Sequence, residues 1–413
     1  MQYKKRFFML ATPTIRQQDK QLSLNEAMIS TPQEATLILD GLATYQVLKH
    51  GIQVRTGEFL RKEGVNLFLS PFTGILNSIS EIRGYFNKPL TSLNFKLSQQ
   101  EQTDETISDL ISSGQRTELL KTLNYLPGIT PYPTSEGENQ LDTLIISLLD
   151  CDPLSPLNQF LLSSYVEEIT EGANFVRGLA RNAVLAVGKN SFQNIQLSNF
   201  EIRTFDETYP NTIPSLVVKS ITGKRILKRA QFLANKIGYI DLYHLIILGK
   251  ILKQKSLNIT VPVYVSGDGK SIIANVRIGT PIYHILNVLG IQSYNIIVSN
   301  NLLSGESVYD LHTPILPNIR SLIADYIILD KKKTENNCIN CGECIRICPA
   351  RVPINILIRY LKNKQYEDAE NLADLSSCLE CGVCGFVCPS KIPIFHYIML
   401  GKYELSSINN REG

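Results

Sequence analysis

The 413-residue sequence has no long uninterrupted apolar run and no strong excess of one charge. Its longest apolar stretches, residues 141–149 and 237–251, are interrupted by Asp142 and by Asp241 and His244. A membrane-spanning helix needs roughly 18 or more apolar residues in succession, so the sequence predicts no span. A net charge of +3, with no basic stripe carrying interleaved aromatic residues, argues against nucleic-acid binding.

The sequence also lacks the usual signs of hydrolytic or nucleophilic catalysis. We find no acid–base dyad, no nucleophile triad and no phosphate-binding P-loop. The five histidines are scattered along the chain, and we expect each to be a core or surface residue rather than a ligand; they are His50, His244, His284, His312 and His396. We therefore expect the chemistry of the chain to depend on another residue type.

Cysteine is almost absent from the first 337 residues, where Cys151 stands alone. A lone cysteine is most often a small buried hydrophobe. The other eight cysteines form two copies of the pattern C-x2-C-x2-C-x3-C-P, beginning at Cys338 and Cys378. This is the ligand spacing of paired [4Fe–4S] clusters. The pattern therefore indicates a protein that transfers electrons.

The spacing also predicts which cysteines share a cluster. Three thiolates on one short loop bind three irons of a cubane, and in two-cluster proteins the fourth ligand is the last cysteine of the other motif. We assign the upstream cluster to Cys338, Cys341, Cys344 and Cys388. We assign the downstream cluster to Cys348, Cys378, Cys381 and Cys384. Crossed ligation would make the two clusters close neighbours, so that an electron passes between them.

Two other uses of these cysteines fit less well. Zinc takes four ligands per site, and the third cysteine and the Cys-Pro of each copy suit zinc poorly. A disulfide framework requires an oxidising compartment. The sequence has no recognisable signal peptide, and its cysteines are concentrated near one end, which favours reduced thiols.

The two motifs belong to an internal repeat, since CINCGECIRICPARVP returns as CLECGVCGFVCPSKIP. Between them, residues 354–375 have apolar residues at helical spacing and predict a helix. We therefore expect a helical ferredoxin domain over residues 333–413. Three glycines lie where backbone would approach a cluster closely, although each could simply form a turn; they are Gly342, Gly382 and Gly385.

The rest of the chain predicts a multidomain α/β and α+β protein. Residues 1–100 contain HGIQVRTGEFL and LSPFTGIL, typical of a lipoyl-like barrel-sandwich β unit, but no lysine at the tip to carry a cofactor. Residues 105–252 alternate strand-like and helical runs, with buried strands expected at 144–146 and 183–187. Residues 255–328 predict a β-grasp segment, with two strands around Gly267-Asp268-Gly269 and a helix after Pro281.

This order of parts resembles the C subunit of the Rnf ion-translocating electron transport (oxidoreductase) complex. The resemblance extends from about residue 40 to about residue 400. Besides the cysteine repeats, the specific elements are DTLIISLLDCDP (Asp142 to Pro153), TYP (Thr208 to Pro210), TGK (Thr222 to Lys224), SGD (Ser266 to Asp268) and RIGTPI (Arg277 to Ile282).

The resemblance implies a fold and a function. The α/β domain would be like the flavin and NADH module of respiratory complex I, and residues 255–328 would be SLBB-like. The chain would be an electron-transfer subunit of a membrane-bound translocase, peripheral on the cytoplasmic face of the inner membrane. Its partners would be other subunits of the complex, including integral membrane ones, and a soluble electron carrier such as ferredoxin. The alternative is an iron–sulfur relay subunit of a heterodisulfide-reductase-like or quinone-linked complex.

The sequence departs from the family in the loop expected to hold FMN and NADH. The family's GGAGFPT corresponds to Gly128–Thr134, GITPYPT, which loses two glycines and places Pro131 where an amide donor is needed. The family's Glu-Cys-Glu-Pro is matched by DCDP at 150–153, and a nearby acidic position is Asn158. We therefore expect both ligands to be lost. In the alternative, Tyr132, Asp150 and Asp152 would still help to hold a flavin.

Attachment to the membrane is expected to come from partner subunits. The sequence ends at Gly413 without a prenylation box, and its second residue is Gln2 rather than an acylatable glycine. The tight basic run Lys331 to Lys333 is expected to be a solvated linker. Its alternative role is a docking point for an acidic redox partner or for lipid headgroups.

Overall fold

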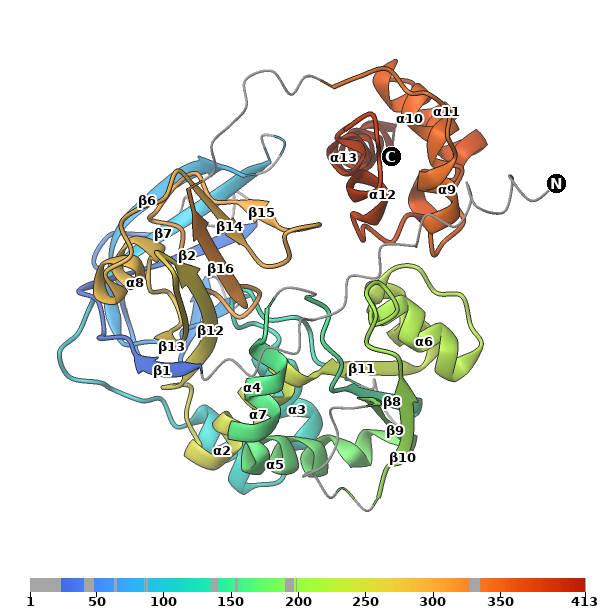
Figure 1. Ribbon diagram of the computed structural model, residues 1–413. Coiled ribbons are helices and arrows are strands. Elements are labelled where there is room, and N and C mark those ends of the chain that lie inside the picture. Colours follow the sequence, from blue (N-terminus) through green and yellow to red (C-terminus); the bar gives the residue numbers. More distant parts are fainter. Residues whose placement is uncertain are drawn as a thin grey trace.

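The computed structural model describes residues 24–40, 48–62, 65–84, 86, 88–134, 140–152, 155–189, 197, 199–326 and 335–412. Gln2, Pro153, Lys331 to Lys333 and Gly413, which entered the sequence predictions, lie outside these ranges. The described elements form a mixed α/β body and a C-terminal helical part beside it (Figure 1). The mixed α/β class predicted from the sequence is confirmed.

The N-terminal part of the body is antiparallel β structure. A four-stranded sheet has the order β2-β7-β6-β3, made of Glu34–Asp40, Pro89–Leu97, Gly74–Arg83 and Gln53–Val54. Strands β4 (Phe59–Lys62) and β5 (Val65–Leu69) form a separate two-stranded ladder. Phe68, Phe72 and Phe95 are fully buried, with the Phe72 and Phe95 rings edge to face at 5.2 Å. Phe68 of β5 also packs edge to face on Phe95 of β7, with ring centroids 6.3 Å apart, and this contact joins the hairpin to the sheet.

A parallel sheet follows the helices α2 (Thr106–Ser112) and α3 (Arg116–Leu123). Its order is β10-β9-β8-β11, from Glu201–Phe205, Ala180–Gly188, Leu141–Ser147 and Ile237–Asp241. The strands expected at 144–146 and 183–187 are confirmed within β8 and β9. Helices α4, α5, α6 and α7 are Leu157–Ser164, Val166–Val176, Pro214–Thr222 and Leu242–Gln254.

Both faces of this parallel sheet are covered, as such sheets require. Leu144 and Ile146 of β8 join the main core with α5 and α7, while Ile145 packs in a second core with Val217 and Val218 of α6. Successive side chains of a strand point to opposite faces. The apolar run of β8 is therefore explained by burial on both sides.

A six-stranded mixed sheet completes the body, in the order β1-β13-β12-β16-β14-β15. Strands β12 (Thr260–Gly267) and β13 (Lys270–Arg277) form the predicted hairpin, and α8 (Ile282–Leu289) follows Pro281 as expected. The other strands are Asn25–Met28 (β1), Ile296–Ser299 (β14), Glu306–Ser307 (β15) and Ser321–Asp325 (β16). Strand β1 pairs in parallel with β13, so this sheet takes one edge strand from the start of the described chain.

The C-terminal part is helical. Its helices are Glu343–Ile347 (α9), Ile354–Lys362 (α10), Tyr366–Ala373 (α11), Val383–Phe386 (α12) and Ile394–Glu412 (α13). The single helix predicted over 354–375 is wrong: the chain turns between α10 and α11, with Lys364 at φ +56°. The apolar residues of α10 and α11 nevertheless share one core with α13. In the described part of the chain, no helix is both long and apolar enough to cross a bilayer.

Candidate iron–sulfur site

The two cysteine motifs adopt the same backbone course. Asn340 and Glu380 have φ +54° and +58°, and Gly342 and Gly382 have φ +80° and +72°. In each copy the glycine directly precedes a short helix, α9 or α12, that carries the third cysteine. The sequence repeat is therefore also a repeat of local structure. Gly385, the third glycine noted in the sequence, lies inside α12 instead.

The fold brings the eight predicted cysteines together in two sets of four. One cavity is lined by Cys338, Cys341, Cys344 and Cys388, and a second by Cys348, Cys378, Cys381 and Cys384. Each cavity thus receives three cysteines from one motif and the last cysteine of the other. Four thiols around one apolar cavity are a donor set that fits a [4Fe–4S] cluster.

The thiols do not converge on a point. Among the described residues, no three His, Cys, Asp or Glu side chains are grouped as they would be around a single metal ion. A cubane has four irons, each with its own cysteine, so its ligands stand around a larger space.

The two cavities differ in their exposure. Cys338 and Cys341 of the upstream cavity are exposed, whereas Cys381 and Cys384 of the downstream cavity are 8% and 7% exposed. Burial raises the pKa of the Cys381 thiol to about 11. A buried thiol of this kind becomes a thiolate only when a bound metal replaces its proton.

Backbone amides supply further contacts to the sulfur atoms. The amide of Val352 donates to the Cys348 sulfur, and the amide of Glu380 donates to the Cys378 sulfur, each at 3.4 Å. Both sulfurs belong to the downstream set. Amide donors to sulfur are one of the means by which proteins adjust such clusters.

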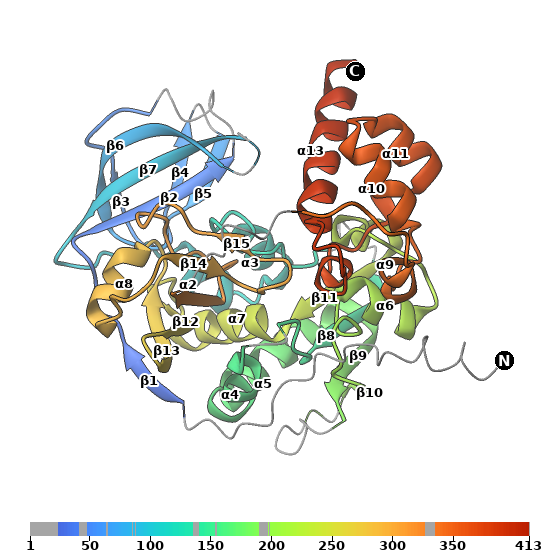
Figure 2. The ribbon, with the colours of Figure 1, turned by 45° about the horizontal axis from the view of Figure 1, so that its top comes forward.

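The downstream cavity lies against the α/β body. The Tyr209 hydroxyl donates to the Cys381 carbonyl at 2.7 Å, and Tyr209, Cys381 and Val383 form a small buried core of their own. A Cβ on Gly382 would lie 2.0 Å from the Leu303 carbonyl oxygen, so this contact requires glycine. Figures 1 and 2 both show the helical part above α6. Burial raises the Tyr209 pKa far above its ordinary value, so its hydroxyl stays a donor.

The loop that corresponds to the family's nucleotide loop, Gly128–Thr134, makes its hydrogen bonds within the protein. The Thr130 amide donates to His244 Nε2 at 3.1 Å, and the Tyr132 amide donates to Asn124 Oδ1 at 2.6 Å. Tyr132 is 1% exposed, and its hydroxyl donates to the His244 carbonyl at 2.9 Å. A Cβ on Gly128 would lie 2.5 Å from Leu316 Cβ. The amides of Thr130 and Tyr132 are therefore already used.

Asp241 holds this loop in place by way of His244. Its carboxylate is buried and caps α7, accepting from the His244 amide at 3.1 Å and from His244 Nδ1 at 2.7 Å. Arg320 and Arg229 donate to the same carboxylate at 2.9 and 3.3 Å. Burial alone would raise the Asp241 pKa, but Arg320 and His244 hold that pKa well below its usual range. The carboxylate is therefore ionised near neutral pH.

His244 is neutral in this arrangement. Burial lowers its pKa, and the Thr130 amide can donate to Nε2 only if that nitrogen carries no proton. Its Nδ1 proton then goes to Asp241. The expectation that His244 is a core residue fits its 1% exposure.

The acidic residues considered as flavin ligands also have partners within the protein. The Asp152 carboxylate accepts from Ser321 Oγ at 3.2 Å, and Asp150 accepts from the Asp152 amide at 2.8 Å. Asn158 donates to the Leu149 carbonyl at 3.0 Å. Cys151 is half-buried rather than fully buried, and its thiol donates to the Thr212 carbonyl at 3.2 Å.

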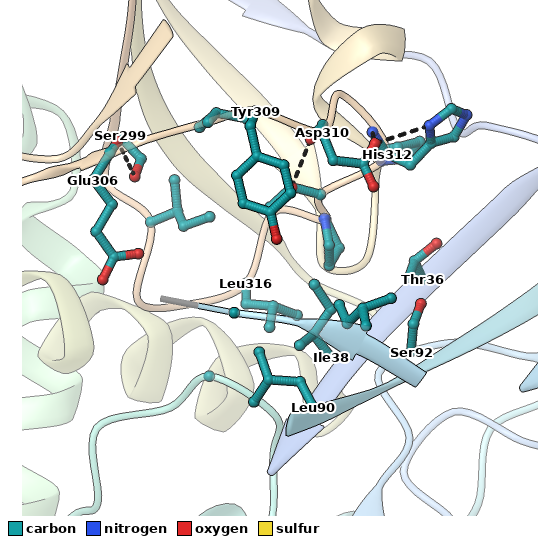
Figure 3. A pocket seen from close by; sticks show the side chains of 18 of the residues that line it. Thr36, Ile38, Leu90, Ser92, Ser299, Glu306, Tyr309, Asp310, His312 and Leu316 are labelled. Carbon is teal, nitrogen blue, oxygen red and sulfur yellow. Dashed lines mark hydrogen bonds and ion pairs between the residues drawn. The ribbon is translucent and has the colours of Figure 1, made fainter. Parts of the chain in front are cut away.

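A separate groove of about 1100 Å³ lies between the β2-β7-β6 sheet and the loop after β15 (Figure 3). Thr36, Ile38, Leu90 and Ser92 form its floor, and Tyr309 lies on the opposite wall. None of the eight cysteines lines it. The candidate electron-transfer site is therefore in the C-terminal part and not in this groove.

Sequence reasoning missed the residues that join the two parts. Tyr209 was noted only as a member of the TYP element, and no sequence motif pointed to Leu303. Lys402 was also missed, although its place in the internal repeat, 40 positions after Lys362, could have drawn attention to it.

The buried Asp241 network leads to a prediction about stability. Replacing Asp241 with Asn leaves the cations of Arg320 and Arg229 without their counter-charge. We expect the free energy of unfolding to fall by about 3–5 kcal/mol at pH 7. Because the folded pKa is depressed, the contribution is present above about pH 4 and lost as pH falls further.

Urea unfolding followed by circular dichroism measures this effect. The control is Asp310→Asn, which removes an exposed carboxylate beside His312 and should change stability by only about 0.5 kcal/mol or less. An Asp241→Asn variant as stable as the parent at pH 7 would contradict the role of the carboxylate.

Comparison with known proteins gives three results. A family model described as "4Fe-4S dicluster domain" matches residues 326–392. Proteins named as the C subunit of the ion-translocating oxidoreductase complex match from Serratia proteamaculans (strain 568), at 26% identity over 58% of this chain, and from Buchnera aphidicola subsp. Acyrthosiphon pisum (strain APS), at 27% over 55%. The matches cover 37% and 51% of those relatives, so the chain spans about half of their length or less.

A solved structure, titled "Crystal structure of NAD+-reducing [NiFe]-hydrogenase in the H2-reduced state", is also similar. The likeness covers 59% of this chain and 46% of that one, at 13% identity and a TM-score of 0.35. That score is too low to establish a shared fold. The sequence-level resemblance is nevertheless confirmed: this chain is a homologue of proteins named as the C subunit of the ion-translocating oxidoreductase complex, and it contains the 4Fe-4S dicluster domain.

Proposed function

We propose that this chain is an electron-transfer subunit of a membrane-bound Rnf-type complex that couples electron transfer to ion translocation. The observation that carries the proposal is the pair of cavities, each lined by four cysteines drawn from both motifs. The names of the relatives favour this function over a heterodisulfide-reductase-like or quinone-linked relay.

The residues that would hold the clusters are the two sets assigned from the sequence. Cys338, Cys341, Cys344 and Cys388 would hold the upstream cluster, and Cys348, Cys378, Cys381 and Cys384 the downstream one. When bound, such clusters accept and release single electrons. The remaining walls are largely apolar, with Ile358 and Ile394 upstream and Ile354 and Ile398 downstream. These side chains would cover the apolar side of each cluster, while Cys338 and Cys341 of the upstream set remain exposed.

The exposed cysteines indicate where a partner would approach. Cys338 and Cys341 lie at the surface, and Ile339 between them is 69% exposed. The downstream set instead faces Tyr209 and Leu303 of the body. We infer that an external redox partner exchanges electrons at the upstream set. That partner would be either another subunit of the complex, integral membrane subunits included, or a soluble carrier such as ferredoxin.

The finer domain assignments are part of the same proposal. Residues 1–100 would form a lipoyl-like barrel-sandwich unit, 105–252 a degenerate domain like the flavoprotein of complex I, 255–328 an SLBB-like β-grasp, and 333–413 the helical ferredoxin domain. The antiparallel sheet with β2 and β7, the covered parallel sheet, and the β12-β13 hairpin followed by α8 support these assignments in turn.

We propose that the α/β domain no longer binds FMN or NADH. A phosphate needs free backbone amides in a glycine-rich turn. Here the Thr130 amide is bound to His244, the Tyr132 amide is bound to Asn124, and Pro131 has no amide. The Gly128 backbone is also packed against Leu316.

Two measurements test the clusters. The anaerobically purified chain should contain about eight irons and eight sulfides, because two cubanes are expected. In Cys348→Ala, the EPR signal lost should be that of the cluster whose other ligands lie near residue 380. Cys151→Ala is the matched control and should keep both signals, since Cys151 lies in neither set. Selective loss of the upstream signal in Cys348→Ala would refute the crossed assignment.

A titration tests the loss of nucleotide binding. We expect the purified chain to release no flavin on denaturation and to show no saturable NADH binding up to about 1 mM, since the amides of the loop are occupied. Isothermal titration calorimetry measures the binding. A micromolar dissociation constant, worth roughly 8 kcal/mol, would show that the loop opens and that NADH is the electron donor.

Membrane attachment is the last part of the proposal: the chain would lie on the cytoplasmic face of the membrane, held by its partners. Expressed alone, it should stay in the supernatant after ultracentrifugation. Co-expressed with the integral subunits, it should sediment with the membranes. Tight binding to protein-free anionic liposomes at physiological salt would contradict attachment through partners and would point to the Lys331 to Lys333 run.

A further inference from the structure

Two lysines at matching positions of the repeat, Lys362 and Lys402, make different contacts. Lys362 ends α10 and Lys402 lies in α13, separated by the same 40 positions that separate Cys338 from Cys378. The Lys402 ammonium donates to the Cys378 carbonyl at 2.7 Å and to Glu380 Oε1 at 2.6 Å. Its side chain is only 19% exposed. A partly buried cation therefore lies directly on the loop of the downstream set.

Lys362 is directed elsewhere. It forms an ion pair with Glu335, and its ammonium lies 5.7 Å from the centre of the Tyr397 ring. Glu335 has no acidic counterpart in the second copy, because Leu375 occupies the matching position. The upstream loop also carries the neutral Asn340 in place of Glu380, and the Asn355 side chain donates to it at 2.9 Å.

A second donor reaches the downstream loop from the α/β body. The Tyr209 hydroxyl donates to the Cys381 carbonyl at 2.7 Å, inside the core that Tyr209 shares with Val383. The carbonyls of two downstream ligands are thus each bound by a donor from another segment. Cys378 is bound from α13, and Cys381 from the turn before α6.

These donors act on the charge that reduction adds. The potential of an iron–sulfur cluster depends on nearby charge, hydrogen bonding and solvent exposure. An ammonium and a hydroxyl proton aimed at the ligand carbonyls favour the extra electron, whereas burial of Cys381 and Cys384 disfavours it. The Glu380 carboxylate opposes Lys402 in part.

We propose that Tyr209 and Lys402 are positioning residues that raise the reduction potential of the downstream cluster by acting through the carbonyls of Cys381 and Cys378. The inference rests on the cluster assignment proposed above. The effect of the two donors offsets that of burial, so the enclosed cluster stays within reach of electrons arriving at the exposed one. Lys362 has no such role, because its ammonium is directed to Glu335 and the Tyr397 ring, whereas that of Lys402 donates to a cysteine carbonyl.

The test is an EPR-monitored redox titration of the anaerobically purified full-length chain. Cys341→Ser, which alters an upstream ligand, identifies which signal belongs to which cluster. In Tyr209→Phe and Lys402→Met, the midpoint potential of the downstream cluster should fall, with the larger shift for Lys402→Met. In Glu380→Gln the same potential should rise, because a negative charge is removed. The upstream potential should not move in any of the three.

Three further variants control for indirect effects. Lys362→Met removes the repeat-related lysine and should leave the downstream potential unchanged. Tyr264→Phe removes a hydroxyl bound to Ser271, far along the chain in β12, and should leave both potentials unchanged. Lys402→Arg keeps the charge and should keep most of the downstream potential.

The outcomes separate this inference from the proposed function. Iron and sulfide are measured first, and their absence from the parent chain would overturn the clusters themselves. If two clusters titrate but Tyr209→Phe and Lys402→Met leave the downstream potential in place, only the tuning role is refuted. If the Lys402→Met chain fails to load iron, Tyr209→Phe is the deciding variant, and an unchanged or raised downstream potential in it overturns the inference.

Discussion

A buried carboxylate, Asp241, holds together the part of the body that supports the candidate site. It ends β11, caps α7, and accepts hydrogen bonds from His244, Arg320 and Arg229. Through His244 it fixes the Gly128–Thr134 loop, and through Arg320 it reaches the segment just before β16. Three sections of chain that are distant in sequence therefore meet at one ionised group, which is stable in the interior because two guanidinium groups neutralise it.

The same network also fixes the Gly128–Thr134 loop through His244. A loop that binds phosphate keeps its amides free and has no Cβ in the way. Here Pro131 removes one amide, His244 accepts from Thr130, and Asn124 accepts from Tyr132. Tyr132 fills the interior with its ring, because it is almost fully buried. The loop is thus part of the core, and its contacts stabilise the body.

The body in turn provides a surface for the helical part. Tyr209, Ile213 and Leu303 contact the second cysteine loop, and Gly382 allows the Leu303 carbonyl to approach it. The cysteine enclosed at this surface, Cys381, belongs to the second copy, whereas the first copy contributes Ile347 to the edge of the contact. Two loops with nearly the same backbone angles therefore have different surroundings, one open to solvent and one enclosed. The asymmetry arises from docking and not from the motifs themselves.

The sequence by itself determined the chemistry of this protein and much of its local structure. The cysteine spacing indicated the donor sets because three of the four cysteines of each set lie on one short loop, and the Cys-Pro of the other copy supplies the fourth. The strands within β8 and β9, the hairpin at Asp268 and the helix after Pro281 followed from apolar runs and turn residues. The break at Lys364 was missed, because the apolar spacing of α10 and α11 continues across a turn that the pattern does not mark. Only the tertiary structure decided which cluster loop is buried, how β1 joins the distant β13, and that His244 binds the Thr130 amide. These depend on contacts between residues far apart in the chain, and no local spacing encodes them.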